Sequence, residues 1–178
     1  MKTSKPKVDL IVAARPNFVK AAPVFQALQA AGLYDLNLIH TGQHHDDEMS
    51  ASFFKHLNIP DPDFNLHISG GTHAEQTART MLAFEKYLSK RKPSWIFVFG
   101  DVNATIACSM VAKKLSVKIA HVEAGLRSFD MSMPEEINRV LTDSISDIYF
   151  TTCLDASENL IKEGKERSKI HMVGNTMI

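Results

Sequence analysis

Short apolar runs alternate with segments of helical spacing along the whole chain, and this alternation limits the possible folds more than any other feature. The apolar runs have the length of buried strands and lie at Val8–Ala14, Leu36–His40, Leu66–Ile68, Trp95–Phe99, Val117–Val122, Ile148–Phe150 and Ile170–Val173. Apolar strands that alternate with helices are typical of a parallel sheet covered on both faces. The sequence therefore predicts an α/β fold, a Rossmann-like doubly wound parallel sheet, with residues 1–178 as one domain.

Turn and capping residues mark the helices between these strands. Pro16 suits the first turn of a helix that Gly32 ends. Thr72 and Glu75 form a capping box at the start of another helix, which Pro93 stops. The remaining helices are expected at about Asp46–Leu57, Asn103–Leu115, Pro134–Ser146 and Asp155–Glu163. Right-handed crossovers would then place every loop that follows a strand at one edge of the sheet.

Composition and charge exclude several classes of function. The chain has twenty basic and twenty acidic residues, so it has no broad electrostatic footprint for nucleic acid or for an anionic membrane. Its first apolar run, Val8–Ala14, is too short for a signal peptide or a membrane span, and we expect a cytoplasmic protein. Cys108 and Cys153 have no Cys-x-x-Cys spacing and are expected to be buried, reduced thiols within helices.

The signatures of the common nucleotide cofactors are missing. The first strand–helix turn reads Ala13-Ala14-Arg15-Pro16-Asn17, which is not the Gly-x-Gly-x-x-Gly of a dinucleotide site. No Walker-type phosphate loop occurs either. The sequence thus argues against NAD(P) or ATP binding as the main function, and we expect no cofactor.

Acidic residues follow two neighbouring predicted strands. Asp101 follows Gly100, the residue directly after the predicted strand Trp95–Phe99. Partial burial at this place would suit proton transfer by the carboxylate, although Asp101 could also cap the next helix. Glu123 directly follows a buried strand, where strand propensity does not favour a glutamate, and Gly125 permits a turn beside it. Because ligands bind beyond the carboxyl ends of parallel strands, we expect both carboxylates in one crevice.

Further charged residues are expected at the same edge. Glu135 and Glu136 lie in the first turn of a helix, where the helix dipole alone could explain them. Arg127 and Arg139 could pair with these acids and complete an acid–base set that moves a proton to and from carbon.

Four other residues have both a structural and a functional interpretation. Arg15 and Lys20, after the first strand, could contact phosphate or be solvated. His44 belongs to a His-His-Asp-Asp cluster without chelating spacing, so we predict no metal site. His121, inside a strand, is expected to be a core or supporting residue and not a catalyst.

Several of these segments resemble the UDP-N-acetylglucosamine 2-epimerases of the non-hydrolysing type. The matching segments, in order, are Arg15-Pro16 with Lys20, Thr41-Gly42-Gln43-His44, Gly100-Asp101, His121-Val122-Glu123-Ala124-Gly125-Leu126-Arg127, Pro134-Glu135-Glu136 with Asn138-Arg139, Thr142-Asp143 and Gly174-Asn175-Thr176. The His121–Arg127 segment followed by Pro-Glu-Glu-x-Asn-Arg is far more specific than an isolated glycine motif.

The resemblance implies the N-terminal domain of a two-domain GT-B enzyme, with the C-terminal nucleotide-binding domain outside this chain. It implies interconversion of UDP-GlcNAc and UDP-ManNAc for surface-polysaccharide synthesis, through removal of the C2 proton, loss of UDP and a 2-acetamidoglucal intermediate. No metal or nicotinamide is needed. The alternatives are a hydrolysing relative that releases ManNAc and UDP, a non-catalytic sugar-nucleotide-binding or partner domain, and a GT-B glycosyltransferase.

Residue roles follow from the same resemblance. The acid–base residues it implies are Asp101, Glu123 and Glu135. The residues it implies for binding UDP-GlcNAc or UDP are Arg15, Lys20, Gln43, His44, Arg127 and Arg139. Gln43 and His44 match a segment at which some members bind a second, regulatory UDP-GlcNAc. The family also implies a homodimer formed through N-terminal-domain helices, and an isolated 178-residue chain is expected to have little activity.

Overall fold

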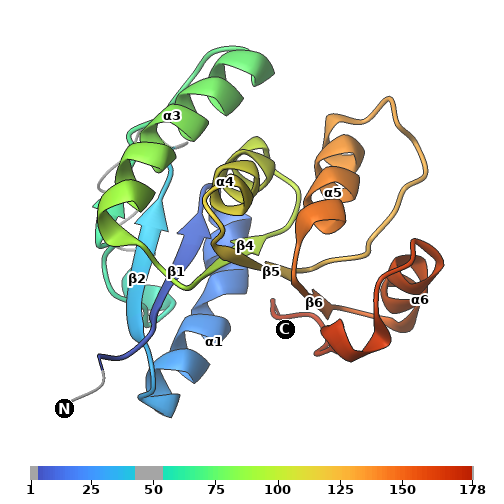
Figure 1. Ribbon diagram of the computed structural model, residues 1–178, viewed down its shortest axis with the longest axis horizontal. Coiled ribbons are helices and arrows are strands. Elements are labelled where there is room, and N and C mark those ends of the chain that lie inside the picture. The colour runs from blue at the N-terminus through green and yellow to red at the C-terminus, as the bar shows by residue number, and fades with distance from the viewer. Residues whose placement is uncertain (1–3, 43–53, 178) are drawn as a thin grey trace.

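The computed structural model describes residues 4–42 and 54–177, and it contains a seven-stranded sheet (Figure 1). The strands are β1 (Lys7–Val12), β2 (Asp35–His40), β3 (Phe64–Asn65), β4 (Trp95–Phe99), β5 (Lys118–Val122), β6 (Ile148–Thr151) and β7 (Ile170–Met172). Their order is β3-β2-β1-β4-β5-β6-β7, and each pair is parallel. The predicted Rossmann-like doubly wound sheet is confirmed, with the strand order reversing between β1 and β4.

The helices lie on both faces of this sheet. They are α1 (Arg15–Ala31), α3 (His73–Arg91), α4 (Asn103–Lys114), α5 (Pro134–Ile145) and α6 (Leu154–Lys162), followed by a 3-10 turn at Arg167–Lys169. Residues 54–56 are also helical, while most of the helix predicted at Asp46–Leu57 lies outside the described residues. Thr72 caps α3 through its side chain, with Glu75 completing the predicted capping box.

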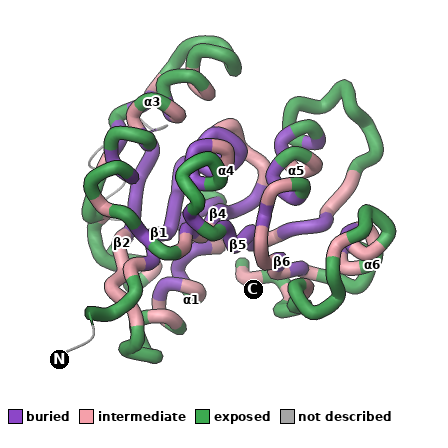
Figure 2. The backbone as a smooth tube through the Cα atoms, in the orientation of Figure 1, coloured by how far each residue is buried: buried purple, intermediate pink, exposed green. Residues whose placement is uncertain are grey.

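Alternate residues of the central strands face opposite layers of core. Leu10 and Val12 of β1 pack with Phe18 and Phe25 of α1 on one face. Ile11 points the other way and packs with side chains of α3 and α4. Figure 2 shows the buried backbone concentrated along β1, β4 and β5 between these layers. The sheet is therefore buried on both faces at its centre, in β1, β4 and β5.

Two local predictions are wrong. The third strand is Phe64–Asn65 and not Leu66–Ile68, because His67 has φ +55° and breaks the extended backbone. Leu66 and Ile68 still donate backbone hydrogen bonds to His40 and Thr41, so the segment follows its neighbour without remaining a strand. Cys108 is buried as expected, but Cys153 is exposed at the start of α6.

None of the helices within residues 4–42 and 54–177 is both long enough and apolar enough to span a membrane. Over the same ranges, no three His, Cys, Asp or Glu side chains gather closely enough to hold a metal ion. His44 and His45 lie outside those ranges.

Candidate active site

The turn after β4 brings Asp101 to the carboxyl edge of the sheet. Gly100 precedes it with φ +62°, and a Cβ at that position would lie 3.2 Å from both Glu123 Oε2 and Lys20 Nζ. Glycine is thus needed both for the left-handed backbone and for the close approach of two charged side chains. Asp101 Oδ2 accepts a hydrogen bond of 2.9 Å from Arg139 Nε, and the side chain remains partly exposed.

Glu123 leaves β5 in a strained conformation. Its φ is +71°, a region that a residue with a side chain occupies only where the surroundings enforce it. Its amide donates to Phe150 O of β6 at 2.9 Å, and its carboxylate pairs with the ammonium of Lys20 from α1. This pair is mostly buried, with side-chain exposures of 12% for Lys20 and 20% for Glu123. Three elements therefore converge on Glu123.

Arg139 links the second carboxylate to α5. It contacts Asp101 and, at 2.6 Å, Glu136 Oε2. The neighbouring Asn138 Nδ2 donates to the backbone carbonyl of Asp101 at 2.8 Å. The first half of α5 thus fixes both the backbone and the side chain of the turn after β4.

Glu136 serves as the anchor of the loop that precedes α5. It is only 1% exposed and accepts hydrogen bonds from the amides of Ser128 and Phe129 at 3.1 and 3.0 Å. Burial opposes ionisation, but these amides and Arg139 outweigh it and lower the pKa of the Glu136 carboxyl. Glu135 points to solvent on the same turn. The two adjacent glutamates therefore occupy different environments, with only Glu135 accessible to a ligand.

A buried ionic network lies beneath the two candidate carboxylates. Asp143 Oδ2 accepts from Gly125 N at 3.0 Å and lies 2.8 Å from Arg127 Nη2. Its other oxygen is 2.7 Å from His121 Nδ1, and His121 Nε2 is 2.8 Å from Gly100 O. A carbonyl oxygen and an ionised carboxylate can only accept, so both ring nitrogens of His121 carry hydrogen.

His121 is consequently a buried imidazolium. Burial lowers the pKa of His121, but the Asp143 carboxylate and the Gly100 carbonyl outweigh that effect and raise it. The pKa of Asp143 is lowered despite burial, because His121 and Arg127 both favour its charged form. Through these contacts the network ties the turn after β4 to β5 and α5.

The predicted binding residue Arg127 is largely buried. Its side chain is 2% exposed and pairs with Asp143 and Glu163, the latter at 2.7 Å. The sequence predicted a substrate-binding arginine, whereas the structure directs this guanidinium into the protein and toward α6. Of the other predicted binding residues, Arg15 is exposed at the start of α1, while Gln43 and His44 lie outside the described residues.

Asn17 is a site residue that the sequence did not predict. It is 3% exposed, its Oδ1 accepts from the amides of Ala13 and Ala14, and its Nδ2 donates to Phe99 O at 3.1 Å. It therefore joins the turn after β1 to the end of β4. A single polar residue in the first turn of a helix gives no periodic signal, and its place one turn before Lys20 is the one feature of the sequence that points to it.

The fold and the site together define an α/β domain with acid–base side chains and cations at the carboxyl edge of a doubly wound sheet. Asp101 and Glu123 lie at adjacent strand ends, each against a cation from a helix. This arrangement is typical of enzymes that bind an anionic substrate and transfer protons within it.

Comparison with known proteins identifies the family. A family model described as UDP-N-acetylglucosamine 2-epimerase matches residues 26–178. The chain is 48% identical over 172 residues to the UDP-N-acetylglucosamine 2-epimerase of Methanocaldococcus jannaschii. The aligned region covers 97% of this chain and 47% of the relative. It belongs to the UDP-N-acetylglucosamine 2-epimerase family.

A second relative is named for a different sugar, and a solved structure has a similar fold. The UDP-2,3-diacetamido-2,3-dideoxy-D-glucuronate 2-epimerase of Pseudomonas aeruginosa is 49% identical over 173 residues, covering 96% of this chain and 49% of that protein. A crystal structure of the M. jannaschii UDP-GlcNAc 2-epimerase with UDP-GlcNAc and UDP has a TM-score of 0.90 over 95% of this chain and 46% of that one. The chain spans about half the length of the curated relatives it matches.

Proposed function

We propose that this chain is the N-terminal domain of a two-domain, GT-B-type UDP-GlcNAc 2-epimerase that interconverts UDP-GlcNAc and UDP-ManNAc. The placement of Asp101 and Glu123 at adjacent strand ends, each with its own cation, is the observation that carries the proposal. The family match and the names of the M. jannaschii relatives support the substrate. A second domain closes the cleft over these side chains and provides the remaining nucleotide contacts.

The proposed reaction moves one proton and breaks one glycosidic bond. A carboxylate of the acid–base set takes the proton from C2, the C1–O bond to UDP breaks with its electron pair going to UDP, and C1=C2 forms. UDP then adds back to C1 of the 2-acetamidoglucal while a carboxylic acid returns a proton to the opposite face of C2. Asp101, Glu123 and Glu135 are the proposed acid–base groups.

Cations around these carboxylates are proposed to receive the diphosphate. Arg15 lies at the N-terminus of α1, where the helix dipole also favours an anion. Lys20 and Arg139 lie on the inner side of the same edge. Gln43 and His44 follow β2 and are proposed to contact a UDP-sugar, while Arg127 is better placed to hold the loop after β5. No cofactor is required by this scheme.

A chimera tests the proposal most directly. The chain is joined to the part of the M. jannaschii relative that follows the aligned region, and both the chimera and the chain alone are incubated with UDP-GlcNAc in D₂O. We expect UDP-ManNAc with deuterium at C2 from the chimera and no turnover from the chain alone. Turnover without deuterium at C2 would exclude the elimination mechanism, and activity of the isolated chain would exclude the need for a second domain.

Product analysis of the same chimera distinguishes an epimerase from a hydrolysing enzyme and one sugar substrate from another. A hydrolysing enzyme would release free ManNAc and UDP, which NMR distinguishes from UDP-ManNAc. The 49% identity to the P. aeruginosa relative favours UDP-2,3-diacetamido-2,3-dideoxy-D-glucuronate as a second candidate substrate. A kcat/KM for that sugar at least about tenfold above that for UDP-GlcNAc would reassign the substrate within the family.

We also propose that the protein is cytoplasmic and forms a homodimer through the helices α3, α4 and α5. Apolar side chains are exposed on this helical layer, including Ile137 at 39% and Leu141 at 45%. A hollow between the three helices is lined by Ala78, Met81 and Ile137, among others. Burial of such side chains against a second copy would remove apolar surface from water.

A further inference from the structure

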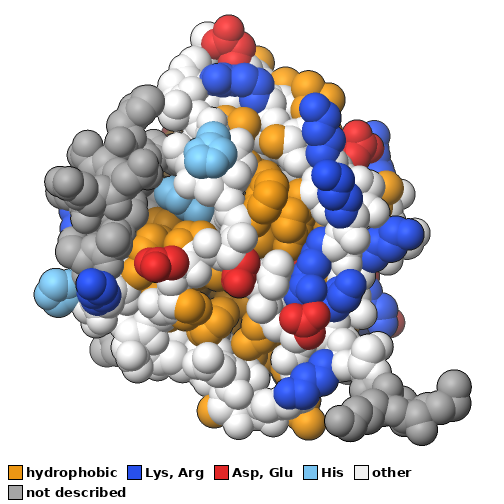
Figure 3. Space-filling model, turned by 90° about the vertical axis from the view of Figure 1, so that its left-hand side faces the viewer, with side chains coloured by type: hydrophobic (Ala, Val, Ile, Leu, Met, Phe, Trp, Pro, Cys, Tyr) orange, Lys and Arg blue, Asp and Glu red, His pale blue; other side chains and the backbone are white. Residues whose placement is uncertain are grey.

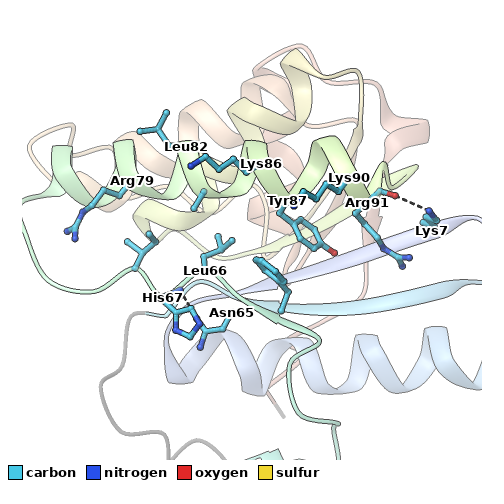
Figure 4. Close-up of a pocket in the computed structure, with 13 residues that line it drawn as sticks. Lys7, Asn65, Leu66, His67, Arg79, Leu82, Lys86, Tyr87, Lys90 and Arg91 are labelled. Atoms are coloured by element: carbon cyan, nitrogen blue, oxygen red, sulfur yellow. Dashed lines mark hydrogen bonds between the residues drawn. The ribbon is translucent and has the colours of Figure 1, made fainter.

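A basic groove runs along α3, between this helix and the residues from Phe64 to Ile68. It arises from the topology, because α3 leaves the β3 edge of the sheet to reach β4 and packs mainly on α4, so part of β2 and β3 remains beside it. Figure 4 shows the groove between α3 and the segment that follows β3. Its volume is about 840 Å³, within the range of small-molecule sites.

The charge of this basic groove is one-sided. Among the described residues, the lining includes five lysines and arginines together with His67 and no Asp or Glu, the five being Lys7, Arg79, Lys86, Lys90 and Arg91. The chain as a whole is neutral, so this is a local excess of positive charge. Figure 3, which faces this side of the molecule, shows Lys and Arg side chains beside an apolar patch.

Among the described residues, Arg91 is the only one of these five cations that forms an ion pair. Arg91 is neutralised by Asp9 and Asp35, but within the described part of the chain neither Lys86 nor Lys90 forms an ion pair. They lie one turn apart on the same face of α3, where like charges weaken a helix slightly. Lys90 is favoured by the helix dipole in the last turn, but Lys86 has no such compensation.

The floor of the basic groove is apolar and partly exposed. Phe64 is 44% exposed, and its ring lies 4.9 Å from that of Tyr87 at an angle of 37°. Leu82 on the wall is 63% exposed, whereas Leu66 beneath is buried. An exposed aromatic ring of this kind offers a face on which a planar group can stack, in a groove that Lys86 and Lys90 also line.

We propose that this basic groove binds a phosphate ester with a planar ring, the chemistry of a nucleotide. The ring would stack on Phe64, and the phosphates would pair with Lys86 and Lys90, whose Cβ atoms one helical turn apart are spaced about 6 Å from each other. A diphosphate spans a similar distance. The groove shares no residue with Asp101, Glu123 or their cations, so its binding can be tested separately from the proposed epimerase activity.

Amide NMR shifts of the ¹⁵N-labelled chain test this inference with three probes: adenosine 5′-diphosphate, inorganic pyrophosphate and adenosine. We expect the diphosphate ester to shift residues 64–68 and 79–90, with a Kd at least about tenfold below that of either fragment, because both halves of the groove are used. If pyrophosphate bound as tightly as the diphosphate ester, the groove would be a general anion-binding patch. Shifts confined to Arg15 and Lys20 would place the ligand at the candidate active site instead. Either result overturns the proposal.

Variants decide which side chains carry the binding. Lys86→Gln with Lys90→Gln should weaken the diphosphate ester at least about tenfold, while Lys114→Gln with Lys162→Gln, also exposed lysines on helices, should leave it unchanged. Phe64→Ser should weaken the ester but not pyrophosphate. Unchanged affinity in the Lys86 and Lys90 variant, with amide spectra showing an intact fold, would refute the site.

Discussion

The buried His121 connects three of the elements that hold the candidate carboxylates, and its charge can be measured. Both ring nitrogens face acceptors, and the pKa of the imidazolium is raised. We expect ¹⁵N NMR to show both nitrogens protonated at pH 7. A neutral ring at pH 7 would contradict the assignment.

The same charge predicts a pH dependence of stability. For a base whose folded pKa is raised, the stabilisation is complete below the unfolded value of about 6.5 and is lost as pH rises through the folded pKa. His121→Gln should lose about 3 kcal/mol of unfolding free energy at pH 6, because Asp143 keeps a charge with one partner fewer. Urea unfolding of both proteins at several pH values checks the loss, and a pH-independent difference would argue for a purely packing role.

Gly125 offers a second prediction at the level of one residue. Its φ is +80°, and a Cβ would lie 2.2 Å from the carbonyl oxygen of Ala156, a backbone atom that cannot move aside. Gly125→Ala should therefore destabilise the fold by about 3 kcal/mol or more. Gly164 has φ +82° but no atom within 4 Å of a Cβ, so Gly164→Ala isolates the backbone strain, about 1 kcal/mol. Chemical unfolding of the two variants should separate these values, and similar losses would contradict the steric argument.

The residues of the site differ in how far the sequence could reveal them. Asp101 and Glu123 stood out because acids rarely follow buried strands without a reason, and the structure places both at the same edge. The partners of Arg127 cannot be predicted in the same way, because a sequence does not show that Asp143 and Glu163 face its guanidinium. The role of Asn17 cannot be predicted from the sequence, because it depends on hydrogen bonds to two backbone groups. One belongs to the nearby Ala13 and the other to Phe99, which is far away in the sequence.

At the scale of elements, the apolar runs predict the position of a strand well where the strand is fully buried, and poorly at the edge of the sheet. The strands β4 and β5 form near their predicted positions because tertiary packing and apolar propensity agree there. The edge strand β3 is displaced toward Phe64 because His67 adopts a left-handed conformation that no propensity at that position favours. Edge strands are held by fewer neighbours, so local backbone choices decide their limits.

The junction of β1 with α3 provides a prediction about pH. Asp9 is fully buried and bonds to Tyr87 and Arg91 of α3. Burial, only partly offset by Arg91, raises the pKa of Asp9 to about 6. For an acid with a raised folded pKa, the native state holds the proton longer than the unfolded chain, so this group lowers stability as pH rises from about 4 to about 6.

Replacement of that carboxyl isolates the effect. Asp9→Asn keeps the size of the side chain and removes the titration, so its stability relative to the parent should improve by about 2 kcal/mol between pH 4 and pH 7.5. Urea unfolding at the two pH values measures the change. A relative stability that falls over this range would show that the Arg91 ion pair outweighs burial.

At the scale of the whole molecule, the chain is divided between two kinds of surface. The carboxyl edge of the sheet holds the candidate site, whereas the layer of α3, α4 and α5 holds exposed apolar side chains. The sequence predicted the first surface, because strand ends are recognisable from apolar runs. It could not place the second, since the exposure of Leu141 and Ile137 depends on how the three helices pack against one another.

That helical layer leads to the last prediction, which concerns assembly. If two copies pair through α3, α4 and α5, a charge at the centre of the layer must be desolvated without a partner, and Leu141→Glu should dissociate the dimer. Leu154 on α6 is 66% exposed and lies outside this layer, so Leu154→Glu serves as the matched control. Light scattering after gel filtration should give a dimeric mass for the parent and the control and a monomeric mass for Leu141→Glu, with unchanged circular dichroism. A monomeric parent would contradict the homodimer, because the apolar layer would then be open to water without a partner. Dissociation by Leu154→Glu instead of Leu141→Glu would place the interface at α6.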